Sequence, residues 1–169
     1  MATTDNQNEV FDVVDDHDRV IGQATRGELH KNTDLTHRSV AVLVFRAKEL
    51  FLQKRSATKD KYPKYWTCSV TGHVDSGETY EEAASRELFE EVGIPASTPM
   101  TQITEEVFKY PYETERMRFF RCESAHPITL HPTEISEGKF FELNEDFFER
   151  ILPTLTITPP LQFILDTLR

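Results

Sequence analysis

The chain has 169 residues, a length typical of one compact domain with a sizeable core. Its 29 acidic and 19 basic residues give a net charge of −10, which argues against general binding to nucleic acid. There is no apolar run long enough for a membrane span. Two cysteines are too few for a disulfide framework, so the reducing cytoplasm is the expected location.

Residues 1–9 are polar, lack the apolar core of a signal peptide and are expected to form a disordered lead to a single domain over 10–169. Alternating or apolar runs bounded by turn residues predict strands. These runs cover 11–15, 19–24, 39–45, 50–54, 66–70, 103–110, 115–122 and 139–143. Helices are predicted where a capping residue opens an amphipathic run, which occurs after Thr25, Thr79, Asn144 and Thr158.

The segment 72–94, GHVDSGETYEEAASRELFEEVGI, has the strongest helical pattern. Thr79 is a good N-cap, and Glu82, three residues later, completes a capping box. Gly93 suits the left-handed position just past the helix end. One apolar stripe follows from the four-residue spacing of Ala84, Leu88 and Val92.

Three glutamates of this helix, Glu87, Glu90 and Glu91, lie at positions i, i+3 and i+4 and share a face. Like charges at this spacing repel one another. Arg86 is expected to pair with Glu82 and Glu90, which leaves two carboxylates unpaired. A solvated acidic face is one interpretation. The other is a site for a hard divalent cation, because Mg²⁺ prefers carboxylates together with substrate phosphates.

The pattern Gly72-x5-Glu78-x7-Arg86-Glu87-Leu88-x-Glu90-Glu91-x-Gly93-Ile94 resembles the Nudix box and is complete at every fixed position. The resemblance implies an α/β fold, namely an α/β/α sandwich with a mixed β-sheet and a loop-helix-loop metal site. It also implies a pyrophosphatase activity, dependent on Mg²⁺ or Mn²⁺, on a small-molecule diphosphate linked to another group. By resemblance, Glu87, Glu90 and Glu91 hold metal or polarise water, and Arg86 orients these glutamates. The backbone carbonyl of Thr71 or Gly72 is expected to complete the metal site.

The flanking segments 13–28, 35–38, 53–56 and 66–73 are similar to one branch of Nudix proteins. That branch contains type I isopentenyl-diphosphate isomerases and uncharacterised hydrolase relatives, and the similarity covers nearly the whole chain. It implies a second metal site formed by His30, His37, His73, Glu113 and Glu115. A Glu-x-Glu pair on a strand places both carboxylates on one face, and mixed histidine and carboxylate ligands suit transition metals. The alternative is that each histidine is an ordinary surface or hydrogen-bonding group.

Three basic residues, Arg26, Arg55 and Lys59, match positions that hold the substrate diphosphate in the isomerases. Arginine offers a bidentate fork to phosphate oxygens, whereas lysine acts as a point charge. These residues are therefore candidates for substrate binding, with ordinary surface charges as the alternative.

At two positions this chain lacks a residue that the isomerases need for their reaction. The isomerases have an acidic cysteine immediately before the box glycine, where this chain has Thr71, and Cys68 lies three residues earlier. They also have a tryptophan that stabilises a carbocation, where this chain has Pro160. A threonine hydroxyl is too weak an acid to protonate an alkene. The chain thus has what hydrolysis needs and lacks what isomerisation needs.

The expected reaction is metal-assisted attack of water on phosphorus. Glu87, Glu91 and Arg86 form its centre, either Glu87 or Glu115 takes the proton, and Arg55 and Lys59 hold the leaving phosphate. An isomerase and a non-catalytic diphosphate-binding module are the alternatives. The sequence leaves open the substrate, among nucleoside, dinucleotide, isoprenoid and coenzyme-like diphosphates, and also leaves a homodimer open.

Overall fold

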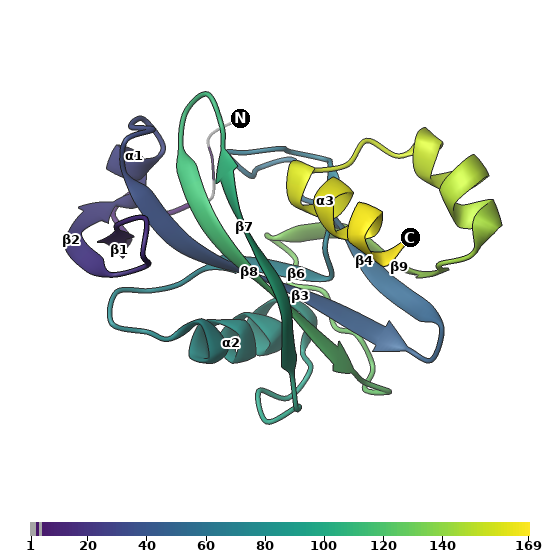
Figure 1. The fold of residues 1–169 in the computed structure, drawn as a ribbon. Helices are drawn as coiled ribbons and strands as arrows, with labels where there is room; N and C mark the ends of the chain where they lie inside the picture. Colours follow the sequence, from purple (N-terminus) through teal and green to yellow (C-terminus); the bar gives the residue numbers. More distant parts are fainter. Residues whose placement is uncertain (1–2, 4) are drawn as a thin grey trace.

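A computed structural model of the chain describes residue 3 and residues 5–169. Its nine strands form one sheet around β3 (Thr36–Arg46). One edge of β3 pairs in parallel with β8 (Thr114–Glu123) along ten residues. The other edge pairs antiparallel with β1 (Val10–Val14), β6 (Val70–His73) and β4 (Glu49–Arg55). The sheet is therefore mixed, as expected (Figure 1).

The remaining strands extend this framework at its edges. β2 (Val20–Thr25) pairs with β1, and β7 (Thr101–Lys109) pairs with β8. β9 (Ile135–Glu142) and β5 (Trp66–Thr67) pair with the two edges of β4. β9 begins four residues before the predicted start, because residues 135–138 continue the pairing along β4.

The single strand predicted over 66–70 is wrong. The chain pairs with β4 at Trp66–Thr67 and then crosses to pair with β3 from Val70 onward. Ser69 makes this crossing, because its fully buried hydroxyl donates to the Phe51 carbonyl and accepts from the Val44 amide. These two bonds replace ladder bonds that a continuous strand would have made.

Helices cover both faces of the sheet. Val40, Val42 and Val44 of β3 pack in the cluster that contains the buried side of α2 (Tyr80–Val92). The alternating residues Ala41, Leu43 and Phe45 pack with α3 (Pro159–Leu168) on the opposite face. Because successive side chains of a strand point to opposite faces, β3 is the centre of both cores. The predicted α/β/α sandwich is confirmed (Figure 1).

The predicted helix starts are found in the structure. Thr79 and Glu82 form a capping box at α2, and Gly93 ends this helix with φ of 73°. Thr25 caps α1 (Arg26–Leu29) in the same way with Glu28.

The other two helix starts lack a capping box. The side chain of Asn144 accepts a hydrogen bond from the Phe147 amide at 3.0 Å, before a π turn (Phe147–Ile151) and a 3-10 turn (Leu152–Thr154). At α3, Thr158 is the N-cap, but its hydroxyl accepts no helix amide and donates to Thr67 Oγ1 at 2.9 Å.

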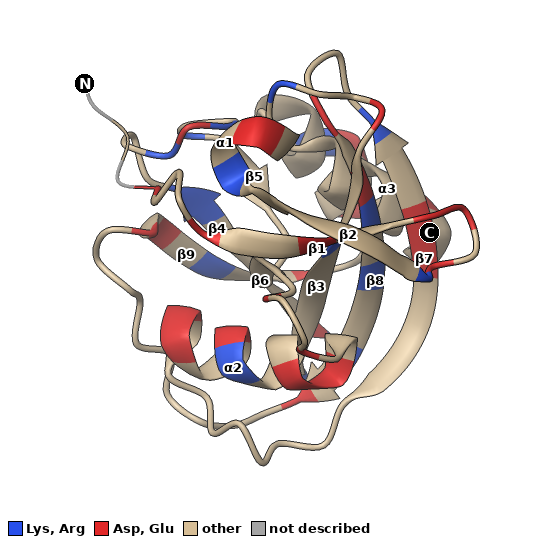
Figure 2. Ribbon diagram, turned by 90° about the vertical axis from the view of Figure 1, so that its left-hand side faces the viewer, with Lys and Arg blue, Asp and Glu red and all other residues tan. Residues whose placement is uncertain are grey.

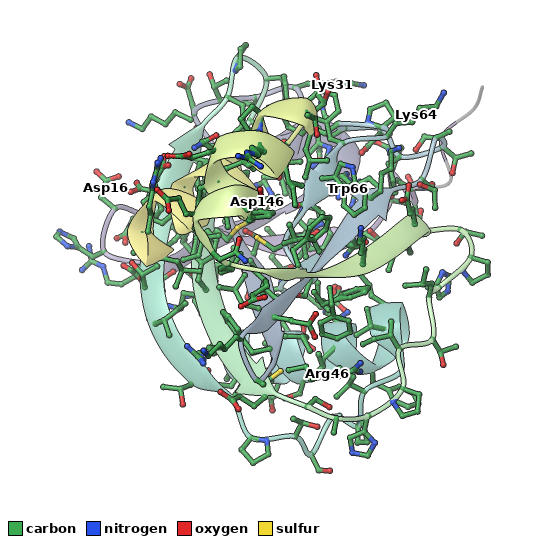
Figure 3. All side chains as sticks on the ribbon, turned by 90° about the vertical axis from the view of Figure 1, so that its right-hand side faces the viewer. Asp16, Lys31, Arg46, Lys64, Trp66 and Asp146 are labelled. Atoms are coloured by element: carbon green, nitrogen blue, oxygen red, sulfur yellow. The ribbon has the colours of Figure 1, made fainter. Side chains whose placement is uncertain are left out.

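Trp66 ties the segment before α3 to the sheet. Its amide donates to the Thr156 carbonyl and its carbonyl accepts from the Thr158 amide, both at 2.9 Å. Trp66 is 7% exposed and its ring meets Phe141 edge-on, whereas charged residues such as Lys64 and Asp146 are exposed (Figure 3). The start of α3 is thus held beside β5.

The expected disordered lead lies partly outside the described residues, because 1–2 and 4 are not described. Residues 5–9 lie against α1, where the Gly27 amide donates to the Gln7 carbonyl at 3.0 Å and the Arg26 amide donates to the Glu9 carbonyl at 2.8 Å. The carboxylate of Asp5 is only 4% exposed. This part of the lead is therefore in contact with the domain.

Cys68 and Cys122 are both buried free thiols. Over the part of the chain that the structure describes, the helices are all too short or too polar to cross a membrane.

Candidate active site

Strand register brings the predicted histidines and glutamates together. Glu115 of β8 lies beside His37 of β3, and His73 of β6 lies opposite Ser39. Residues 37 and 39 point to the same face because side chains alternate along a strand. The two histidines and Glu115 therefore share one side of the sheet, and Glu113 immediately precedes β8, two residues before Glu115.

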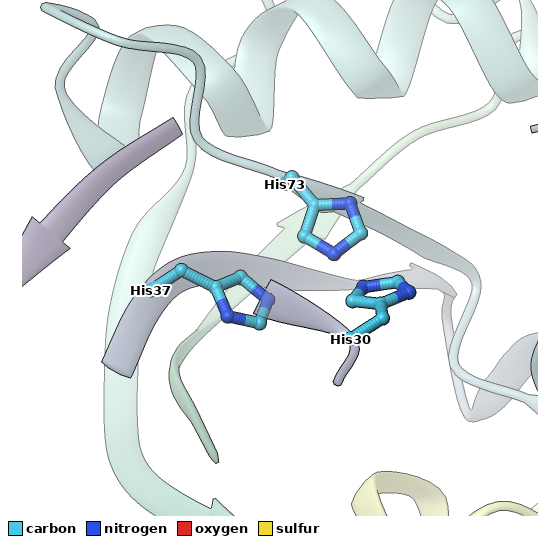
Figure 4. A group of neighbouring side chains, drawn as sticks. All are labelled: His30, His37 and His73. Carbon is cyan, nitrogen blue, oxygen red and sulfur yellow. The ribbon is translucent and has the colours of Figure 1, made fainter. Parts of the chain in front are cut away.

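His30 completes this group from α1, where it is the C-cap residue. One ring nitrogen from each of His30, His37 and His73 lies within 4.8 Å of the others. The ring centroids are 5.1–5.9 Å apart, and Figure 4 shows the three rings converging from separate segments. The capping box of α1 sets the position of His30, which is why the short helix matters for the site.

The environment keeps two of these histidines neutral. Burial lowers the pKa of His37 to about 4 and, together with the charge of Arg26, lowers the pKa of His73 well below its usual value. Burial also lowers the pKa of His30, but the hydrogen bonds with Asp60 and Glu113 outweigh it and raise the pKa. Neutral imidazole is the form that binds a metal.

Glu113 lies between two of the rings. Its Oε2 is 2.8 Å from His30 Nε2 and 4.0 Å from His37 Nε2. Among the described residues, the fully buried Nε2 of His37 has no hydrogen-bond partner. A buried nitrogen without a partner is costly unless a ligand satisfies it. The donor set of three histidines and two carboxylates therefore fits a transition metal.

The glutamates of α2 approach β6 from the other face of the sheet. Glu91 is buried and accepts from Gln53 Nε2 at 2.6 Å and from the Thr71 amide at 3.2 Å. Glu87 lies so close to Gly72 that a Cβ there would overlap its carboxyl group. The third glutamate, Glu90, is 54% exposed. The absence of a side chain at position 72 is what lets Glu87 reach the strand.

These carboxylates are poorly solvated. Burial, with repulsion from Glu91, raises the pKa of Glu87 to about 8, and burial raises the pKa of Glu91 to about 7. Burial and the nearby charge of Glu113 raise the pKa of Glu115 to about 7. A divalent cation would favour the ionised forms, and carboxylate oxygens are the ligands of Mg²⁺. In Figure 2, acidic positions, coloured red, recur along the ribbon of α2.

Arg86 holds this acidic face in position. Its guanidinium donates to both Glu78 oxygens at 2.8 and 2.9 Å and to Glu87 at 2.7 Å. It also donates to the His73 carbonyl at 3.1 Å, and it lies 3.4 Å from Glu90. The expected pairing with Glu82 is wrong, because the Glu82 carboxylate accepts the Thr79 amide in the capping box.

The two groups of residues meet beside β6, which pairs only with β3 among the described strands and so leaves one edge open. A cavity of about 430 Å³ lies here. Its lining includes residues from both groups: Gly72, His73, His30, Arg86, Glu87, Glu90, Glu91, Glu113 and Glu115. Residues on opposite faces of a sheet thus share one cavity, which strand and helix periodicity alone does not predict.

The three candidate substrate-binding cations, Arg26, Arg55 and Lys59, also line the cavity. Arg26 lies 3.2 Å from both Asp60 and His73 Nδ1, and Lys59 pairs with Glu134 at 2.6 Å and with Asp5. Arg55 donates to the Lys61 carbonyl and forms no ion pair with the described residues.

Sequence reasoning missed the four acids that pair with Arg26 and Lys59, namely Asp5, Glu9, Asp60 and Glu134. Each is a single acid in a polar segment without periodicity, so no sequence signal distinguished it. Thr71 and Pro160, the two departures from the isomerase pattern, both line the cavity, whereas Cys68 is fully buried outside the lining.

Comparisons with known proteins agree with this geometry. The NUDIX domain family matches residues 35–153. An uncharacterized Nudix hydrolase of Pseudomonas aeruginosa is 36% identical over 128 residues, or 75% of each chain. Isopentenyl-diphosphate Delta-isomerase 2 of Photorhabdus laumondii is 37% identical over 144 residues, covering 80% of this chain and 78% of its own. The crystal structure of DR0079 from Deinococcus radiodurans aligns with a TM-score of 0.79 and 26% identity, over 94% of this chain and 98% of that one.

Proposed function

Because the chain belongs to the NUDIX family, whose members act on pyrophosphate-containing substrates, we propose that it hydrolyses a small-molecule diphosphate linked to another group, using Mg²⁺ or Mn²⁺. The observation that carries the proposal is the pair formed by the buried Glu91 and the partly buried Glu87, both with raised pKa values and both lining the cavity. Strongly shifted carboxylates in a cleft are typical of catalytic sites. A cytoplasmic location, with no membrane or nucleic-acid partner, belongs to the same proposal.

The residues of α2 and β6 have distinct roles in this reaction. Glu87, Glu90, Glu91 and the carbonyl of Gly72 would hold the divalent cation. When bound, it neutralises phosphate charge and lowers the pKa of water. Arg86 fixes Glu87 through its 2.7 Å contact, which keeps the carboxylate in one position. Either Glu87 or Glu115 accepts the proton.

The basic side of the cavity would hold the phosphates. Arg55 is the cation best placed for this role, because no acid of the described residues pairs with it. Arg26 and Lys59 would join it, although both are ion-paired in the structure. A fixed cation stabilises the leaving phosphate without reorganising during the reaction.

A second, transition-metal site is proposed at His30, His37, His73, Glu113 and Glu115. The convergence of the three ring nitrogens within 4.8 Å and the unpartnered Nε2 of His37 support it.

Isomerisation is the alternative function, favoured by the similarity to the Photorhabdus isomerase. The residues that line the cavity weaken this alternative. Thr71 stands where the isomerases carry an acid, and Pro160 stands where they carry an aromatic ring. Neither side chain can supply a proton of suitable acidity or a π face. A non-catalytic binding module would not need a complete set of box glutamates.

Phosphorus NMR on a panel of diphosphates, with isopentenyl diphosphate included, tests the proposal. The wild-type protein with MgCl₂ is expected to produce new phosphate signals from at least one class of substrate. Glu91→Gln should reduce kcat by roughly 10²–10³-fold, comparable with the loss of one strong electrostatic contact.

The matched control is Glu81→Gln, which makes the same change on the exposed side of α2 and should keep wild-type activity. Conversion of isopentenyl diphosphate to dimethylallyl diphosphate without phosphate release would contradict hydrolysis and support the isomerase.

A further inference from the structure

The segment formed by residues 5–9 crosses one side of the cavity. Asp5, Asn6 and Glu9 belong to its lining. Two backbone hydrogen bonds, from the Gly27 amide to Gln7 and from the Arg26 amide to Glu9, hold the segment against α1. Most of its other contacts are polar ones, made by the carboxylates of Asp5 and Glu9 and by Gln7 Nε2, which lies 3.4 Å from Asp60 Oδ2.

The carboxylate of Asp5 occupies an anion site in this cavity. It accepts from the Nζ of Lys59 and from the Asp60 amide at 2.9 Å, and it lies 3.7 Å from the guanidinium of Arg26. The side chain is 4% exposed, so the contact is almost fully desolvated. An ammonium, a guanidinium and a backbone amide are the groups that recognise a phosphate oxygen.

The local charge balance opposes a second anion while the segment is bound. Four carboxylates, those of Asp5, Glu9, Asp60 and Glu134, pair with the fixed charges of Arg26 and Lys59, and Asp60 also lies 3.4 Å from Nδ1 of His30. With His30 neutral, this group has a net charge of −2, which repels a phosphate. Departure of residues 5–9 removes two of the carboxylates and leaves the group neutral.

We propose that residues 5–9 form a displaceable strap, in which the Asp5 carboxylate holds the anion site at Lys59 and Arg26 until a substrate phosphate replaces it. The inference rests on the proposed function for the identity of the anion. The carboxylate and the phosphate compete for the same donors. The apparent affinity for substrate is therefore the intrinsic affinity multiplied by the fraction of molecules in which the strap is open.

Calorimetric titration with methylenediphosphonate in MgCl₂ tests the strap. The P–C–P bond of this probe cannot be hydrolysed, so the measurement does not depend on turnover and stays interpretable if the hydrolase proposal fails. Asp5→Asn keeps the size of the side chain and removes its charge, and it should bind the probe about tenfold tighter than wild type, equivalent to about 1.4 kcal/mol. Asp16→Asn, the same change on an exposed turn, should bind like wild type.

Equal or weaker binding by Asp5→Asn would overturn the proposal, because Asp5 would then support Lys59 instead of competing for it. Failure of both proteins to bind would also overturn it, since the anion site would not accept a phosphate. Hydrogen exchange gives a second readout: the probe should speed exchange at the Arg26 and Gly27 amides, which lose their strap partners. Slower exchange there would mean that the strap closes over the ligand, contrary to the proposal.

Discussion

Gly72 shows how a single residue determines the geometry of this site. It lies opposite Val40, on the face of the sheet that α2 covers, and Glu87 fills the space that a side chain there would take. Arg86 then holds Glu87 from the other side at 2.7 Å. The absence of a Cβ at position 72 leaves room for the Glu87 carboxylate, and the ion pair with Arg86 holds it there.

Gly72→Ala should therefore displace Glu87 and leave the fold in place. Overpacking at one site costs about 1–3 kcal/mol. A shift of roughly 1 Å in a catalytic group can cost about 10²-fold in rate, so we expect a loss of kcat of this order. Steady-state kinetics and urea denaturation measure the two effects.

The matched control is Gly22→Ala on the exposed strand β2, where a Cβ meets nothing within 4 Å. It should change neither activity nor stability. Full activity of a folded Gly72→Ala protein would show that Glu87 is not needed at its observed position.

At the scale of elements, the loop before α2 is anchored to β1 through Asp12. The carboxylate accepts from Ser76 Oγ at 2.7 Å, from the Gly77 amide at 3.0 Å and from Gln23 Nε2 at 3.3 Å. Burial raises the pKa of Asp12, but these hydrogen bonds outweigh it and lower the pKa below 3.8. One acid in the first strand thus positions the start of the box.

Asp12→Asn should cost about 1–2 kcal/mol of unfolding free energy near neutral pH, since hydrogen bonds to a charged group are lost. The native pKa is lowered, so wild type holds this advantage above 3.8 and loses it as the pH falls through the native pKa. Urea denaturation of both proteins across this range measures the difference. A difference that stays constant with pH would contradict the assignment, and Asp16→Asn serves as the exposed control.

At the scale of the whole molecule, the cavity concentrates acids whose native pKa values of about 7 to 8 exceed the ordinary value of 4.5. A native state with raised acid pKa values binds more protons than the unfolded chain. The lowered pKa values of His37 and His73 act in the opposite direction only up to about pH 6.5, so the metal-free protein should lose stability as the pH rises from there through 7 to 8.

Added Mg²⁺ should reverse this loss at high pH. At about 100 times its dissociation constant, a ligand of the native state adds about 2.7 kcal/mol, which corresponds to roughly 5–10 °C in Tm for a domain of this size. Thermal scans in EDTA and in MgCl₂ over this pH range provide the measurement. Glu91→Gln, the control, should show a weaker pH slope and a smaller response to Mg²⁺. A metal-free protein with constant stability over this range would contradict the argument.

Much of the fold could be predicted because its signals are local. The capping boxes at Thr25 and Thr79 and the left-handed Gly93 are short-range patterns, and the structure confirms them. The strand over 66–70 was predicted wrongly, since the choice between β4 and β3 as partner depends on the buried hydroxyl of Ser69. The assigned roles of the site residues stay predictions until the activity is measured.

The sequence by itself determined the Nudix box, the shared face of its glutamates and the candidate histidines. Helical spacing is enough to place Glu87 and Glu91 together, because they are one turn apart. Only the tertiary structure decided that the histidines converge within 4.8 Å, that Arg86 pairs with Glu78 instead of Glu82, and that Asp5 enters the anion site. These three outcomes depend on pairing between strands and on which charges become neighbours after folding, and neither is encoded in residue spacing.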